Sequence, residues 1–119
     1  MGQPVYRLLG GPTRTAARLY THVGIYDHSQ LVEDVQRDIA AGFSAFKTGA
    51  WFNLKQLPEH EALAAFVERV ALLRSTIGPG YDIMVDNHGR DRAASAIRLM
   101  HALQPQRLFW LEEPTPPDD

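Results

Sequence analysis

Hydrophobic residues recur along the chain in two alternating patterns. Four short runs rich in β-branched and aromatic residues predict strands at residues 18–23, 43–48, 81–86 and 107–112. Three longer runs with apolar positions every three or four residues predict helices at residues 30–41, 58–77 and 91–103. The order β-α-β-α-β-α-β calls for a parallel sheet whose crossover connections are right-handed.

Residue signals mark where the predicted helices begin and end. Ser29 is the expected N-cap of the first helix, and Gly42 follows that helix at a position that favours positive φ. Pro58 begins the second helix and Gly78 ends it. The side chains expected to face the core are Leu31, Val35 and Ile39 on the first helix, Leu63, Phe66, Val67, Val70, Leu73 and Ile77 on the second, and Ala93, Ile97 and Met100 on the third.

Residues 1–16 are rich in glycine and proline and predict an irregular lead-in, with one helical turn at residues 6–9. Two parallel architectures compete for residues 17–119. An open doubly wound sheet usually carries a glycine fingerprint after its first strand, and residues 24–27 do not form one. A (β/α)8 barrel instead gathers its polar chemistry at the C-terminal ends of successive strands.

Charged residues stand at the ends of three successive predicted strands. Lys47 ends the second strand, Asp86 and His88 end the third, and Glu112 and Glu113 end the fourth. Because strand side chains alternate, Asp86 and His88 share a face of the sheet. Neighbouring strands lie ~4.8 Å apart, so carboxylates at two adjacent strand ends can reach one ion. Hard oxygen ligands of this kind suit Mg²⁺, and the placement favours the barrel.

Each of these residues alone has a simpler interpretation. Asp86 fits a turn or a helix cap, His88 a solvated loop and Lys47 a surface position. Their occurrence at the same end of three consecutive strands favours a site. Trp51 and Phe52, in the loop after the second strand, are interpreted either as part of a lid or as packing residues. Structural roles are expected for the remaining histidines, which are His22, His28, His60 and His101.

Composition removes several classes of function. The chain has 119 residues, 45% of them hydrophobic, with a net charge of -2 and no cysteine. Intrinsic disorder, a disulfide-stapled scaffold and thiol chemistry are therefore not expected. Near-neutral charge argues against nucleic acid or a membrane surface as a partner, and no apolar run approaches the ~20 residues of a membrane-spanning helix. The N-terminus lacks a signal-peptide pattern, so a cytoplasmic location is expected.

The sequence resembles the enolase superfamily in four segments, at residues 2–11, 42–47, 85–90 and 111–114. Within that superfamily it is most similar to the mandelate racemase/muconate lactonizing branch, and there to the acid-sugar dehydratases of the galactonate dehydratase type. The step of 26 residues from Asp86 to Glu112 also resembles the family's spacing of its first two metal ligands. The resemblance implies that this chain is the first half, about four βα units, of a TIM-type (β/α)8 barrel.

The resemblance also implies a reaction and a role for each strand-end residue. Such enzymes bind a carboxylate substrate on Mg²⁺, remove the α-proton, stabilise the enediolate and expel a β-hydroxyl as water. Asp86 and Glu112 correspond to metal ligands, His88 to the general acid and Lys47 to the cation that faces the substrate carboxylate. Supporting roles, in binding substrate or holding the surrounding loops, fall to Asn87, Arg90 and Glu113.

Some features depart from the family pattern. Racemases of this branch carry a second lysine where this chain has Gly49, which disfavours a two-base racemisation. Residues 1–16 are expected to lead in from a capping domain, and the third metal ligand and the catalytic base to lie beyond Asp119. Two alternatives stay open: a racemase or cycloisomerase of the same superfamily, and a truncated, inert half-barrel. The expected partners are a small sugar acid and, through the edges of the outer strands, a second copy of the chain.

Overall fold

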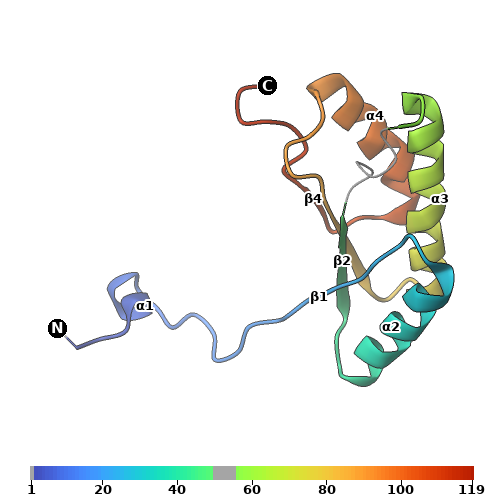
Figure 1. Cartoon of the computed structure of the whole chain (residues 1–119). Coiled ribbons are helices and arrows are strands. Elements are labelled where there is room, and N and C mark those ends of the chain that lie inside the picture. Colours follow the sequence, from blue (N-terminus) through green and yellow to red (C-terminus); the bar gives the residue numbers. More distant parts are fainter. Residues whose placement is uncertain (1, 50–55) are drawn as a thin grey trace.

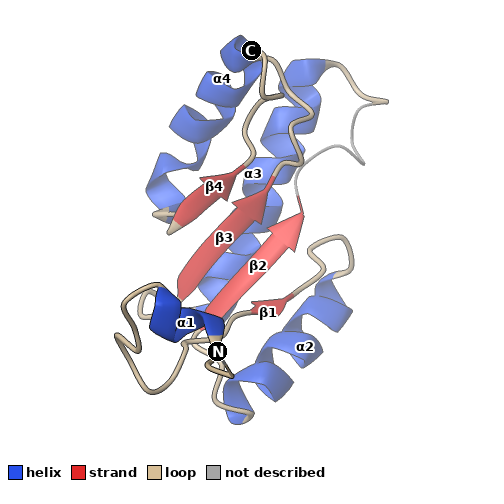
Figure 2. Ribbon diagram, turned by 90° about the vertical axis from the view of Figure 1, so that its left-hand side faces the viewer, coloured by secondary structure: helices blue, strands red, loops and turns tan. Residues whose placement is uncertain are grey.

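Four parallel strands form a single sheet in chain order, as the sequence predicted. The computed structural model describes residues 2–49 and 56–119, so Trp51 and Phe52 lie outside the described residues. The strands are β1 (Thr21–His22), β2 (Ala45–Gly49), β3 (Asp82–Asp86) and β4 (Trp110–Glu112). Figure 2 shows them side by side, all pointing toward the same end of the sheet.

Three helices cover one face of this sheet (Figure 1). They are α2 (His28–Ala40), α3 (Glu59–Ile77) and α4 (Ala93–Leu103), and each follows one strand and precedes the next. The short helix α1 (Val5–Leu8) lies in the lead-in, where one helical turn was predicted, and the chain between it and β1 extends away from the sheet. A 3-10 turn, η2 (Gln104–Gln106), links α4 to β4. Among the described residues, no helix is long and apolar enough to cross a membrane.

The hydrophobic core lies between the sheet and the three helices. From the sheet it takes Phe46, Ile83 and Val85, whose alternation places them on the helix-covered face. The long helix α3 crosses the back of the sheet and contributes the largest share of buried side chains. The fully buried helical residues of this core are Leu31, Val35, Phe66, Val70, Leu73, Leu99 and Leu103.

The beginning of α2 differs from the prediction. Asp27, not Ser29, is the N-cap, because its side chain accepts a hydrogen bond from the Gln30 backbone N–H at 3.0 Å. Ser29 lies inside the first turn. Both residue types are favourable caps, so sequence alone does not separate two candidates two positions apart. The predicted end of this helix is confirmed, since Gly42 has a φ of 95°.

The inward face of α4 was also predicted wrongly. Ile97 and Met100 are 55% and 54% exposed, whereas Ala96, Leu99 and Leu103 are buried. Two apolar stripes run along this helix, and contact with α3 and the sheet selects the second. Leu108, which precedes the first paired residue of β4, Trp110, packs against the helix-covered core.

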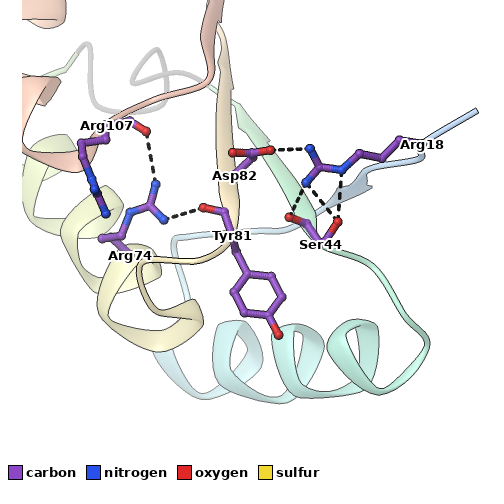
Figure 3. Close-up of polar contacts among 6 residues, drawn as sticks. All are labelled: Arg18, Ser44, Arg74, Tyr81, Asp82 and Arg107. Atoms are coloured by element: carbon purple, nitrogen blue, oxygen red, sulfur yellow. Dashed lines mark hydrogen bonds and ion pairs between the residues drawn. The ribbon is translucent and has the colours of Figure 1, made fainter.

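Two arginines hold the N-terminal ends of the strands together (Figure 3). Arg18 donates to the carbonyl oxygen of Ser44 at 2.9 Å and pairs with Asp82 Oδ2 at 2.5 Å, so it joins the starts of β1, β2 and β3. Arg74 donates to the carbonyl oxygens of Tyr81 at 2.6 Å and Gln106 at 2.8 Å, and its burial lowers its pKa. These contacts stabilise the end of the sheet where the strands begin.

We predict that Leu99→Ala lowers the free energy of unfolding by about 3 kcal/mol, because it leaves a cavity between α4 and the sheet. The matched change Ile97→Ala, two residues away on the exposed stripe, should cost less than about 0.5 kcal/mol. Urea denaturation of both variants measures the difference. A larger loss for Ile97→Ala than for Leu99→Ala would show that α4 packs with the face that the periodicity predicted.

Candidate active site

Three charged side chains meet where β2, β3 and β4 end. Lys47 Nζ lies 2.8 Å from Asp86 Oδ2 and 3.0 Å from Glu112 Oε2. The strand register causes this meeting, since Asp86 is paired directly with Glu112 across β3 and β4. Gly49, the β2 residue in register with Asp86, has no side chain. The cation therefore comes from Lys47, two residues earlier on the same face.

Burial makes this cluster electrostatically strong. The side chains of Lys47 and Asp86 are only 7% and 10% exposed, whereas Glu112 is partly open to solvent. Burial by itself acts to raise the pKa of Asp86, but the hydrogen bond and charge of Lys47 outweigh it, with help from His88, and the pKa is lowered. The pKa of Lys47 is raised, chiefly by its hydrogen bond to Asp86. The cluster therefore holds one ammonium and an ionised Asp86 at neutral pH.

His88 joins the cluster through a turn in the backbone. It has a φ of 54°, and its backbone N–H lies 3.3 Å from Asp86 Oδ1 while its Nε2 lies 3.0 Å from Asp86 Oδ2. The imidazole is half exposed, at 51%. One edge of the ring thus lies against Asp86, and about half of the side chain is open to solvent.

The other three predicted residues lie around this cluster. Asn87 is fully buried and donates to Asp91 and to the carbonyl oxygen of Pro114, so its side chain takes the opposite direction, as alternation predicted. Glu113 is exposed and has a φ of 43°, and Arg90 is also exposed. The structure therefore brings four of the seven predicted residues into contact and leaves these three beside them.

One neighbour of the cluster escaped the sequence analysis. The ring of Tyr20 lies 5.5 Å from Lys47 Nζ, and its centroid is 5.6 Å from that of His22 and 5.9 Å from that of Trp110. Tyr20 directly precedes β1, and its ring links Lys47 to the rings of His22 in β1 and Trp110 in β4. The signal was the alternation of residues 18–23, which places Tyr20 and His22 on one face.

The two carboxylates of the cluster meet part of what a hard divalent cation requires. Asp86 and Glu112 each direct one carboxylate oxygen at the same positive charge, and paired carboxylates on one centre are the ligands that Mg²⁺ takes from proteins. Among residues 2–49 and 56–119, no group of three or more His, Cys, Asp or Glu side chains is arranged to hold a metal. Within these residues, Asp86 and Glu112 are the pair that could hold a metal, and water or substrate would have to complete its shell.

A parallel sheet with helices on one face and charged side chains at the strand ends is the arrangement of an active site in (β/α)-barrel proteins. Residues 30–119 match the enolase C-terminal domain-like family. That match covers most of the chain, so the chain belongs to this family, and the predicted superfamily and α/β fold class are confirmed.

Sequence and structure comparisons give the same placement. The D-galactonate dehydratase of Variovorax paradoxus is 36% identical over 114 residues, which are 96% of this chain and 30% of that protein. An enolase of Agrobacterium radiobacter with bound sodium and L-malate has a TM-score of 0.84 at 30% identity, over 98% of this chain and 30% of its own. A racemase of Streptomyces coelicolor with bound magnesium has a TM-score of 0.78 at 33% identity, over 98% of this chain and 33% of its own. This chain thus spans about a third of the length of these relatives.

We predict that Lys47→Met lowers the free energy of unfolding at pH 7 by about 3 kcal/mol, because it leaves two carboxylates without their shared cation. Because the pKa of Asp86 is lowered and that of Lys47 is raised, this stabilisation is fully present from about pH 4 to about pH 10 and is lost progressively outside that range. The difference between wild type and variant should therefore shrink as the pH falls and Asp86 is protonated. Urea denaturation at pH 7 and at acidic pH measures it, and a difference that is constant with pH would contradict the ion pair.

Proposed function

We propose that this chain is part of a magnesium-dependent acid-sugar dehydratase that acts on a galactonate-like aldonate. The single observation that carries the proposal is the convergence of Lys47, Asp86, Glu112 and His88 at the strand ends. The similarity to D-galactonate dehydratases over 96% of the chain supports the reaction class. The bound magnesium of the S. coelicolor racemase supports the choice of metal.

In this proposal Asp86 and Glu112 would hold the metal. When bound, Mg²⁺ supplies a Lewis acid that binds the substrate carboxylate and makes the α-proton more acidic. Lys47 is an ammonium hydrogen-bonded to carboxylates, so it acts as a fixed positive charge and not as a base. Its task is to stabilise the negative charge that builds on the substrate carboxylate as the α-proton leaves.

His88 would complete the elimination as a general acid. Its imidazolium gives a proton to the departing β-hydroxyl oxygen, the C–O bond breaks, and water leaves while the α,β double bond forms. Its Nε2 lies 3.0 Å from Asp86 Oδ2, and its half-exposed position leaves it open to a substrate. We assign the base that removes the α-proton to residues outside this chain, because the chain spans only 30% of the dehydratase it resembles.

A racemase of the same superfamily remains the second candidate, favoured by the similarity to the S. coelicolor protein. The sequence of β2 argues against it, since a base at the end of this strand would need to occupy position 49, which is glycine. A racemase needs no general acid at His88. Loss of His88 therefore separates the two functions.

The decisive experiment builds this chain into a full-length protein. We predict that a chimera, with this chain in place of the matching 114 residues of the V. paradoxus D-galactonate dehydratase, converts D-galactonate with Mg²⁺ to a 2-keto-3-deoxy acid. His88→Asn in that chimera should lower kcat about 10²–10⁴-fold, because the leaving hydroxide loses its proton donor. Exchange of the α-proton with deuterated solvent should persist.

His101→Asn, on the outer end of α4, is the matched control and should leave kcat unchanged. The chain of 119 residues alone should give no product with any aldonate, because the assigned base is outside it. A His88→Asn chimera that still dehydrates D-galactonate would overturn the general-acid role. Racemised aldonate in place of a keto acid would favour the second candidate.

A further inference from the structure

The segment that follows β4 is joined to the loop that follows β3. We name residues 113–119 the exit segment and residues 87–92 the β3–α4 loop. The Asn87 backbone N–H donates to the Glu112 carbonyl oxygen at 2.9 Å, and that of Gly89 to the Glu113 carbonyl oxygen at 2.8 Å. In Figure 1 the C-terminal chain curls back beside the loop that leads into α4. The parallel pairing of β3 and β4 thus continues past their last strand residues.

Asn87 adds a side-chain contact to this junction. Its Nδ2 donates to the Pro114 carbonyl oxygen at 2.9 Å, in the exit segment, and to Asp91 Oδ2 at 3.0 Å, in its own loop. The residue is fully buried, and its Oδ1 has no hydrogen-bond partner in the part of the chain that the structure describes. A leucine would fill a similar volume without burying an unpaired oxygen. The presence of an amide side chain at this buried position is therefore better explained by the hydrogen bonds that its N–H groups donate than by packing.

These contacts hold the chain on both sides of Glu113. One contact precedes Glu113, at the Glu112 carbonyl, and the other follows it, at the Pro114 carbonyl. Glu113 itself has a φ of 43°, a conformation that non-glycine residues rarely adopt without support. Asn87 thus stabilises the turn that begins directly after Glu112. Because Asn87 also follows Asp86 directly in the chain, it connects the two residues.

We propose that Asn87 is a positioning residue. The hydrogen bond from its side-chain amide to the exit segment fixes the Glu112 carboxylate relative to that of Asp86. The proposal deepens the proposed function and rests on it in one respect, since Asp86 and Glu112 are taken as the metal ligands. Asn87 touches neither the metal nor the substrate in this account. It acts through the backbone of β4, and supporting partners of this kind commonly change metal affinity about 10–100-fold.

Three variants separate the bond to Pro114 from the bond to Asp91. Asn87→Asp removes both donors at neutral pH, since a carboxylate only accepts. Adding Asp91→Asn to it supplies a new donor at position 91 and restores the bond within the loop, but leaves the Pro114 carbonyl without a donor. Asp91→Asn alone is the matched control, because its amide oxygen still accepts from Asn87.

Two measurements on the full-length chimera follow the effect: titration calorimetry with MgCl₂, and hydrogen exchange at the Gly89 amide, which donates to the exit segment. We expect Asn87→Asp and the double variant to bind Mg²⁺ about tenfold more weakly and to exchange the Gly89 amide faster, with the control close to wild type. A double variant that binds Mg²⁺ as tightly as wild type would overturn the proposal. So would an Asn87→Asp variant whose Mg²⁺ affinity is within about twofold of wild type. Asn87→Leu, which removes the donors without burying a charge, replaces Asn87→Asp if the latter does not fold.

The same measurements distinguish this proposal from the proposed function. If the chimera with the wild-type chain binds no Mg²⁺, the metal-dependent function fails, and the exchange data decide about Asn87. Faster Gly89 exchange in Asn87→Asp and in the double variant, but not in the control, would then still support its positioning role. Unchanged exchange in all three variants would overturn it.

Discussion

Two carboxylates in register on neighbouring strands set the central constraint of this molecule. Asp86 and Glu112 are paired across β3 and β4, so their negative charges meet at the end of the sheet. Such a pair in a buried position requires a cation close by, because like charges in a medium of low polarity repel strongly. Lys47 provides this cation and bonds to both carboxylates. The arrangement thus holds two carboxylates and one ammonium together at the end of the sheet.

The two ends of the sheet have different tasks. Where the strands begin, Arg18 and Arg74 bond to carbonyl oxygens and to Asp82, and these contacts join neighbouring loops (Figure 3). Where the strands end, the side chains are charged, and two residues with positive φ, His88 and Glu113, surround the cluster. Parallel βα proteins generally divide stability and chemistry between opposite ends of their strands in this way. Among residues 2–49 and 56–119, the non-glycine residues with positive φ are His88 and Glu113, at this end of the sheet, and Arg107, in the loop before β4.

Much of this arrangement could be predicted from local patterns. The alternation of strands and helices gave the parallel order, and the positions of the strand ends brought Lys47, Asp86 and Glu112 together. His88 was also predicted beside Asp86, but a backbone turn with positive φ, not strand alternation, brings it there. Features that depend on distant contacts could not be predicted. Contact with α3 decides which stripe of α4 is buried, and Ile97 was placed wrongly for that reason. The bond from Asn87 to Pro114 spans 27 residues of sequence, and no local signal indicates it.

The central claim, that Asp86 and Glu112 direct their oxygens at one cation, is tested most directly by locating a metal in crystals. Mn²⁺ takes the same oxygen ligands as Mg²⁺ and has a measurable anomalous signal. Anomalous diffraction from crystals grown with MnCl₂ should show one strong peak at coordination distance from both carboxylates. A peak at other carboxylates of the chain, or none at the ends of β3 and β4, would contradict the account.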